Sequence, residues 1–223
     1  REYICWTSGL GSNLLGYADP AYCDHVSKQL SLTGGSLSLP SHLESQVADK
    51  LGSMLSAHVP GWQEQPLGVR FAKTGSDVTT MAIRLARAVT NRPYIMTFTG
   101  HYHGWGDWTI SRTSPGWGIL PPDATAVGEI FDRKNWNRIR EVEFGDTNIG
   151  GYYRFDEIAA IIFEVGLVAP PDGYYQFLRR LCDQTGTLLI VDEVVTGLRY
   201  GLGGACERYG IEPDLVAMGK ALG

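Results

Sequence analysis

Residues 188–196, Leu-Leu-Ile-Val-Asp-Glu-Val-Val-Thr, decide the fold class of this chain. Four apolar residues, two of them β-branched, run directly into two carboxylates, as in a buried parallel strand that delivers an acid to the edge of a sheet. In open α/β sheets, ligands bind just beyond the carboxyl ends of the strands. The stretch therefore predicts an α/β protein with a ligand site beside Asp192.

A second buried strand is expected at residues 214–218, and Lys220 follows it by two positions. A carboxylate and an amine would then emerge at the same edge of the sheet. This pairing suits pyridoxal 5′-phosphate (PLP), because an amine can hold this cofactor as a Schiff base and a carboxylate can keep its pyridine nitrogen protonated. On their own, a surface lysine and an ion-paired or helix-capping aspartate are the alternatives.

Composition and charge indicate which classes of protein are compatible with this sequence. The chain has 223 residues, of which 43% are hydrophobic and 19% are charged, enough for one sizeable core. Its formal net charge is -5, and Lys and Arg form no cluster, which argues against a nucleic-acid partner. A small-molecule substrate is expected.

Cysteine usage and hydropathy indicate a cytoplasmic protein. The four cysteines are spread singly, without the pairing of a zinc site or the density of a disulfide scaffold. No apolar run approaches the length of a membrane span, so no membrane partner is expected. His101 and His103 lack a third ligand at a telling spacing, so no metal is expected either.

The first third of the chain predicts two helices and a strand. Pro20 suits the first turn of a helix that runs to about Leu30. Residues 41–44, Ser-His-Leu-Glu, have the form of a capping box that opens a second helix with apolar residues at every fourth position. Residues 69–73 are a candidate strand.

Thr74-Gly75-Ser76-Asp77 precedes a strongly helical segment at 78–89. Gly75 lets the backbone approach a ligand closely, and the first amides of the helix point at whatever lies before it. The motif predicts either a phosphate cradle or an ordinary helix cap, and the two remain equally open.

A further strand at 94–99 runs into Gly100-His-Tyr-His-Gly-Trp-Gly106. Here Tyr102 or His103 could lie as a planar side chain against a flat ligand, and a structural aromatic is the competing interpretation. Residues 107–155 are expected to be mostly loop, with short elements near Ala126 and at 138–144.

Residues 158–164 predict a buried strand that ends in Glu164, followed by a helix at 173–185 and then by the strand that carries Asp192. Such a β-α-β unit has a right-handed crossover. Glu164 and Asp192 should therefore lie at the same edge of a parallel sheet.

Four motifs in order resemble the class III PLP-dependent aminotransferases of fold type I, and are most similar to the glutamate-1-semialdehyde aminomutase-like branch. The motifs are Arg70-Phe-Ala-Lys-Thr-Gly-Ser-Asp77, Gly100-His-Tyr-His-Gly104, Leu189-Ile-Val-Asp-Glu-Val-Val-Thr-Gly197 and Pro213-Asp-Leu-Val-Ala-Met-Gly-Lys220. The resemblance implies a three-layer α-β-α sandwich with a mainly parallel sheet. Residues 1–40 would line the active site and residues 41–223 would form part of the large, PLP-binding domain.

The resemblance also implies roles for individual residues. Lys220 would be the Schiff-base lysine and the base that moves the substrate α-proton, and Asp192 would pair with the pyridinium nitrogen. The other cofactor-binding residues would be Gly75 and Ser76 at the phosphate, Val194 and Tyr102 on the two ring faces, His103 beside Tyr102, and Glu164 near the ring. Trp6 falls where the family often places an aromatic residue of the substrate pocket.

The sequence departs from the family pattern in three places that matter. Val165 stands where a proline usually follows the strand-end glutamate, and Phe144-Gly145-Asp146 stands where an Asn near the cofactor hydroxyl is commonly found. The chain also ends at Gly223, before the expected C-terminal small domain. The chain is therefore expected to be a fragment or a short relative of a homodimeric enzyme. Its expected reaction is transamination between an amino donor and a keto or aldehyde acceptor. An aminomutase and a non-catalytic truncated relative are the alternatives.

Overall fold

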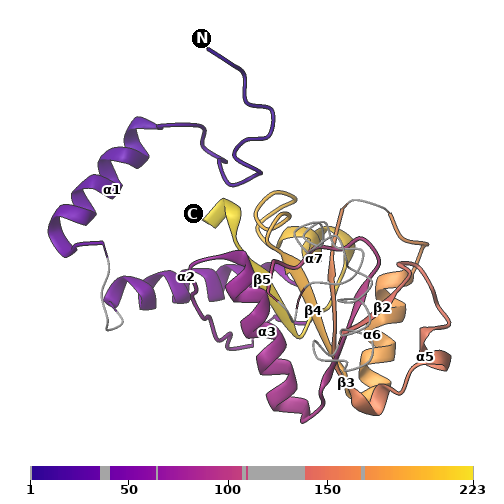
Figure 1. The fold of residues 1–223 in the computed structure, drawn as a ribbon. Coiled ribbons are helices and arrows are strands. Elements are labelled where there is room, and N and C mark those ends of the chain that lie inside the picture. The colour runs from indigo at the N-terminus through magenta and orange to yellow at the C-terminus, as the bar shows by residue number, and fades with distance from the viewer. Residues whose placement is uncertain are drawn as a thin grey trace, which may run out of the picture.

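The computed structural model describes residues 2–35, 41–63, 65–106, 109, 139–166 and 169–222. Its centre is a sheet of five parallel strands in the order β2-β1-β3-β4-β5 (Figure 1). The strands are β1 (Tyr94–Phe98), β2 (Ile139–Val142), β3 (Ile158–Glu164), β4 (Leu188–Glu193) and β5 (Leu215–Met218). The predicted α/β class is confirmed.

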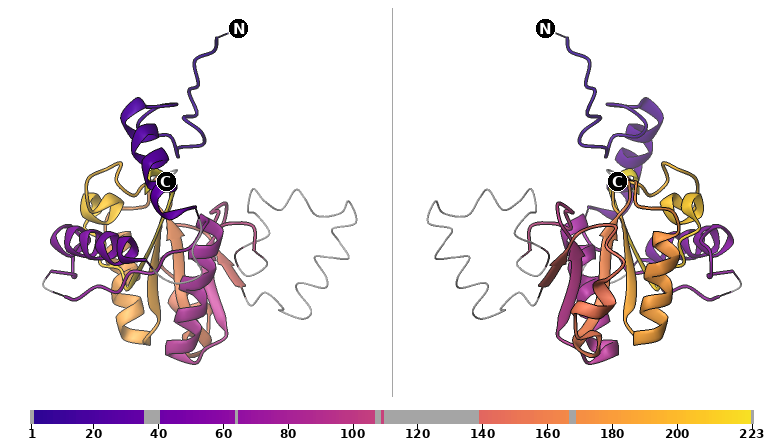
Figure 2. Two further views of the ribbon diagram at one scale, coloured as in Figure 1. Left: turned by 90° about the vertical axis from the view of Figure 1, so that its left-hand side faces the viewer. Right: turned by 90° about the vertical axis from the view of Figure 1, so that its right-hand side faces the viewer.

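Helices cover both faces of the sheet (Figure 2). On one face, Ile83 and Ala86 of α3 (Gly75–Thr90) pack on side chains of β1, β3 and β4. On the other face, α2 (His42–His58), α6 (Tyr174–Thr185) and α7 (Gly204–Tyr209) share a larger apolar cluster with the sheet. The predicted three layers are therefore present in the described part of the chain.

The two central strands are buried because helices cover both of their faces. Every residue of β3 except Glu164 is buried, as is every residue of β4 except Leu188. A strand buried on both faces has a continuous apolar sequence, which is why 158–163 and 188–191 were recognisable. The parallel register pairs Glu164 with Asp192, so the two acids do lie at one edge.

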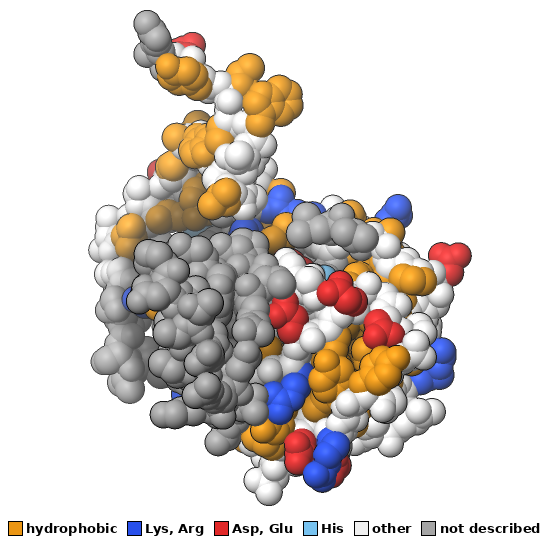
Figure 3. Space-filling view, turned by 45° about the vertical axis from the view of Figure 1, so that its right-hand side comes forward, with side chains coloured by type: hydrophobic (Ala, Val, Ile, Leu, Met, Phe, Trp, Pro, Cys, Tyr) orange, Lys and Arg blue, Asp and Glu red, His pale blue; other side chains and the backbone are white. Residues whose placement is uncertain are grey.

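Much of the N-terminal segment projects from this body (Figure 1). Helix α1 (Pro20–Thr33) is capped by the side chain of Asp19, and none of its residues is buried. Apolar side chains gather on the projecting arm (Figure 3), including Tyr3, Ile4 and Trp6. In the described residues, no helix is long and apolar enough to cross a membrane.

Three local expectations need correction. Residues 69–73 do not form a strand, and no strand among the described residues pairs with them. The Ser41 side chain makes no capping hydrogen bond to α2, although that helix does begin at His42. Helix α3 starts at Gly75, earlier than predicted, because Thr74 and Asp77 form the capping box there.

Smaller elements complete the described chain. Helix α5 (Ile149–Tyr152) and the 3₁₀ turn η2 (Phe155–Glu157) lie between β2 and β3, and the 3₁₀ turn η3 (Lys220–Leu222) follows β5. Strand β2 falls inside the short element expected at 138–144. The element expected near Ala126 lies outside the described residues.

Candidate active site

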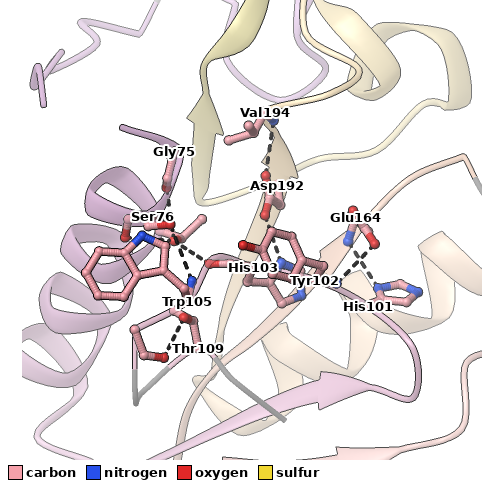
Figure 4. A network of polar contacts seen from close by, with 12 residues as sticks. Gly75, Ser76, His101, Tyr102, His103, Trp105, Thr109, Glu164, Asp192 and Val194 are labelled. Atoms are coloured by element: carbon pink, nitrogen blue, oxygen red, sulfur yellow. Dashed lines mark hydrogen bonds and ion pairs between the residues drawn. The ribbon is translucent and has the colours of Figure 1, made fainter. Parts of the chain in front are cut away.

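A buried carboxylate and imidazole form the centre of the site (Figure 4). Asp192, at the carboxyl end of β4, has its Oδ2 atom 2.8 Å from Nδ1 of His103, and its Oδ1 accepts a hydrogen bond from the backbone N–H of Val194 at 3.1 Å. Asp192 is 5% exposed and His103 is 2% exposed. Because an unpaired charge is costly to bury, each side chain depends on the other.

The other ring nitrogen of His103 has no protein partner among the described residues. Its Nε2 is buried without a hydrogen bond, although nearly all buried polar atoms have one. The backbone of His103 is held in place, since the Thr79 hydroxyl on α3 donates to its carbonyl oxygen at 2.7 Å. The imidazole is therefore fixed with one nitrogen on Asp192 and the other unsatisfied.

The N-terminus of α3 borders the same loop. Thr74 and Asp77 satisfy each other's backbone N–H groups, which leaves the amides of Gly75 and Ser76 in the first turn without intrahelical acceptors. The Oγ atom of Ser76 accepts from the backbone N–H of Trp105 at 3.4 Å. The helix-cap interpretation of this motif is confirmed by the capping box, and the phosphate cradle stays a prediction.

Val194 connects this helix end to the strand that precedes the candidate lysine. A Cβ atom on Gly75 would lie 3.0 Å from Cγ1 of Val194, and one on Gly219 would lie 3.4 Å from the same atom. The approach is tight at Gly75, where a side chain would displace Val194, and is an ordinary contact at Gly219. The end of β4, the start of α3 and the residue before Lys220 thus form one packed unit.

Lys220 lies directly after β5, with a backbone φ of 46° in the left-handed region. Its side chain lies against the N-terminal segment, because a Cβ on Gly11 would be 3.6 Å from Cδ of Lys220 and 3.1 Å from Nη2 of Arg199. A part of residues 1–40 therefore lies beside Lys220. Arg199 and Gly11 were not predicted, since no local pattern brings them to the lysine.

Glu164 completes the row of groups at the edge of the sheet. Its Oε1 accepts from the backbone N–H of Tyr102 at 3.1 Å, and its own N–H donates to Nδ1 of His101 at 3.2 Å. Burial raises the pKa of the Glu164 carboxyl, and the charges of His103 and Lys220 partly offset this effect. Burial also lowers the pKa of His101 to about 4. The predicted site thus includes a carboxyl whose pKa is raised by its burial.

Glu193 follows Asp192 in the 188–196 stretch, and no role was predicted for it from the sequence. Its buried carboxylate accepts hydrogen bonds from the Thr196 hydroxyl and from the backbone N–H groups of Ala205 and Cys206. These bonds join the end of β4 to the first turn of α7. Glu193 therefore stabilises the junction between β4 and α7, while its neighbour Asp192 contacts His103.

Trp6 is the predicted site residue that the described structure does not bring to this cluster. It is 89% exposed on the N-terminal segment, whereas Gly11 of the same segment reaches Lys220. Tyr102 lies beside His103, with its side chain 39% exposed (Figure 4). Gly75, Ser76, Tyr102, His103, Glu164, Asp192, Val194 and Lys220 all lie at this end of the sheet.

The comparison with protein families agrees with the motifs. The model of the family described as "Aminotransferase class-III" matches residues 1–223. A glutamate-1-semialdehyde 2,1-aminomutase from Syntrophobacter fumaroxidans is 37% identical over 235 residues, with 100% of this chain and 51% of the relative covered. The enzyme of the same name from Gemmatimonas aurantiaca is 36% identical, with 100% and 50% covered.

Solved structures show the same likeness. An omega-transaminase from Sphaerobacter thermophilus has a TM-score of 0.77 and 30% identity, with 98% of this chain and 50% of that chain covered. The FumI protein of Sphingopyxis sp. MTA144, in its PLP internal aldimine form, has a TM-score of 0.76 and 28% identity, with 98% and 49% covered. The chain spans about half the length of the curated relatives it matches. It belongs to the class III aminotransferase family.

Proposed function

We propose that these residues form the cofactor-binding part of a PLP-dependent enzyme that moves an amino group from an amino donor to a keto or aldehyde acceptor. The observation that carries the proposal is the buried Asp192–His103 pair at the end of β4, with Lys220 after the adjacent strand β5. A carboxylate, an amine and a free helix N-terminus stand at one edge of the sheet. Aminotransferase relatives over the whole chain support this choice.

The described residues fit PLP. A phosphate group could be bound by the amides of Gly75 and Ser76 at the start of α3, a 16-residue helix whose dipole favours an anion there. Asp192, fixed through its bonds to His103 and Val194, could bind a protonated pyridine nitrogen through a charge-assisted hydrogen bond. The unsatisfied Nε2 of His103 also indicates that polar groups are missing from this region.

When bound, PLP supplies an electron sink for the bond that breaks at the substrate α-carbon. Lys220 would hold the cofactor covalently through Nζ, and its amine would be the base that moves the proton of the substrate α-carbon. Asp192 would pair with the pyridine nitrogen, and His103 would orient Asp192.

The remaining predicted residues shape the pocket. Val194 and Tyr102 would contact the two faces of the ring, and Glu164, whose pKa is raised by burial, would lie near the ring. Trp6 would reach the substrate only if the N-terminal segment lies closer to the site in the complete protein. A homodimer in the cytoplasm, acting on a small amine or amino acid and a carbonyl compound, completes the proposal.

A second candidate is an aminomutase, which moves the amino group within one molecule. It is favoured by the two relatives at 36 and 37% identity, both named glutamate-1-semialdehyde 2,1-aminomutase. Incubating the full-length protein with glutamate-1-semialdehyde and no external acceptor separates the two reactions. Conversion indicates an aminomutase, and a requirement for a separate acceptor indicates a transaminase.

Binding of PLP tests the shared part of both candidates. The protein is titrated with PLP and its visible absorbance is recorded after dialysis, beside Lys220→Ala and a control, Lys50→Ala, on the exposed surface of α2. A dialysis-resistant band in the parent and the control that is absent from Lys220→Ala supports the proposal. A silent titration of the complete protein contradicts it and favours the third candidate, a non-catalytic relative.

A further inference from the structure

A side-chain hydrogen bond joins His101, in the loop after β1, to the end of β3. The backbone N–H of Glu164 donates to Nδ1 of His101 at 3.2 Å. The register of β1 with β3 pairs residues up to Met96 and Ile161, so Glu164 lies beyond it. The His101 side chain therefore supplies an acceptor to β3 at a position that β1 does not reach.

A second hydrogen bond joins the same two segments in the opposite direction. The backbone N–H of Tyr102 donates to Oε1 of Glu164 at 3.1 Å. The loop thus contributes a side-chain acceptor and a backbone donor, while Glu164 contributes a backbone donor and a side-chain acceptor. Loss of the His101 acceptor would leave this part of the loop attached to Glu164 by one bond.

The hydrogen bond also determines the protonation of the His101 ring. A ring nitrogen that accepts from a backbone N–H carries no proton, so the neutral ring has its proton on Nε2. The rings of Phe98 and Phe144 lie with their centroids 5.5 Å and 4.9 Å from that of His101. Burial lowers the pKa of His101 to about 4, so Nδ1 remains an acceptor at neutral pH.

The rest of the loop is attached to two other elements. Nδ1 of His103 lies 2.8 Å from Oδ2 of Asp192 on β4. The Thr79 hydroxyl on α3 donates to the carbonyl oxygen of His103 at 2.7 Å. These bonds hold His103, whereas the attachment of His101 and Tyr102 to β3 depends on Glu164.

We propose that His101 is a positioning residue, whose imidazole holds residues 100–104 against the end of β3 and thereby fixes Tyr102 for contact with the cofactor ring. In Figure 4 the His101 ring lies on the far side of Glu164 from Ser76, away from the start of α3. Its action on the site is therefore through Tyr102. The part of this inference that concerns the cofactor rests on the proposed function, and the attachment of the loop does not.

Two substitutions separate the acceptor from the bulk of the ring. His101→Asn places an amide oxygen where Nδ1 stands, since each atom is bonded to Cγ, and His101→Leu keeps an apolar side chain without an acceptor. His25→Leu, at an exposed position of α1, is the control. Hydrogen exchange of the complete protein without cofactor is measured at single amides, and PLP affinity is then measured by titration.

The exchange of the Tyr102 and Glu164 amides reports the attachment of the loop. In His101→Leu, both amides should exchange at least about tenfold faster than in the parent, because loss of one bond loosens the other. In His101→Asn and in the control, both rates should stay within about threefold of the parent. The amides of β4 should exchange at the parent rate in every variant, which shows that the sheet remains folded.

PLP affinity reports the consequence for the site. The dissociation constant of PLP should rise at least about tenfold in His101→Leu, because Tyr102 is no longer fixed. It should stay within about threefold of the parent in His101→Asn and in the control. Rescue by an acceptor of different shape is not expected if His101 serves only to fill space.

Each other outcome overturns the proposal. Parent-like exchange in His101→Leu would mean that the attachment does not need His101, and faster exchange of Glu164 alone would mean that His101 does not hold Tyr102. Equal effects of Asn and Leu would assign the ring to packing alone, and unchanged PLP affinity in His101→Leu would remove the link to the cofactor. A parent that binds no PLP contradicts the proposed function, while the exchange rates still decide whether His101 attaches the loop.

Discussion

Glu164 and Asp192 are register partners on neighbouring parallel strands, yet their carboxyl groups have different surroundings. Asp192 is fixed by His103 and by the backbone of Val194. Glu164 receives one backbone N–H, from Tyr102, and burial raises its pKa. Two acids at the same sheet edge are thereby held in different ways, Asp192 by a side chain and a backbone N–H, and Glu164 by a backbone N–H in surroundings that raise its pKa.

Removing the His103 ring should destabilise the fold. In His103→Ala, the Oδ2 atom of Asp192 loses its partner in a buried site, which should lower the free energy of unfolding by about 1–3 kcal/mol. Urea denaturation followed by circular dichroism measures the change. His25→Ala, at an exposed position of α1, is the control and should unfold like the parent. Equal midpoints for both variants would show that the pair contributes no net stability.

Loss of the Glu193 carboxylate should lower the free energy of unfolding by at least as much as loss of the His103 ring. Glu193→Ala leaves the Thr196 hydroxyl and two backbone N–H groups of α7 without their acceptor, so we expect a loss of about 3 kcal/mol or more. The control is Glu44→Ala on the exposed surface of α2, with an expected loss below about 1 kcal/mol. Denaturant unfolding of the two variants checks this order, which a smaller effect at Glu193 would contradict.

Gly104 is expected not to tolerate replacement by any residue with a side chain. Its φ is 103°, and an added Cβ would lie 2.6 Å from Oγ and 2.9 Å from Cα of Ser76. Gly104→Ala should therefore cost about 1–3 kcal/mol and push the loop away from the start of α3. Gly151→Ala in α5 meets no atom within 4 Å and should be neutral or stabilising by up to about 1 kcal/mol. Thermal unfolding of the pair tests this contrast.

His101 should make stability depend on pH between about 4 and 6.5. Because burial lowers its pKa from 6.5 to about 4, the unfolded chain binds more protons than the folded chain in this window. Stability then rises with pH across the window and falls on acidification. Glu164 contributes a slope of opposite sign, because its pKa is raised in the folded state.

A difference experiment isolates the His101 effect. The free energy of unfolding of the parent and of His101→Gln is measured from pH 4 to pH 7, with Glu164 present in both. The parent should lose stability relative to the variant as the pH falls through the window. Parallel curves would show that His101 titrates alike in the folded and unfolded chain.

The features predicted most accurately were those that depend on residues close together in the sequence. The apolar runs that became β3 and β5 were placed within one residue, and the run at 188–191 marked the start of β4. Strands buried on both faces, such as β3 and β4, need apolar residues at successive positions. The meeting of Glu164 and Asp192 followed from the handedness of one β-α-β unit. The position of Lys220 after β5 followed from the apolar run at 214–218, because the lysine stands two residues beyond it.

Contacts between segments far apart in the sequence could not be predicted from local patterns. The pattern of Val69 and Phe71 favoured a strand, but a strand also needs a partner, and none is described beside it. Ser41 has the sequence of a cap without the hydrogen bond. The pairing of His103 with Asp192, 89 residues apart, and the contact of Gly11 with Lys220 depend on how loops pack, which no local period encodes.

Helix α1 has 14 residues and buries none of them, so it lacks the tertiary contacts that stabilise most helices in proteins. A helix of this length is only marginally stable by itself in water. Its melting should therefore be broad and uncoupled from the core. A calorimetric scan would then show a gradual change in heat capacity at low temperature, well before the cooperative peak of the sheet and its helices.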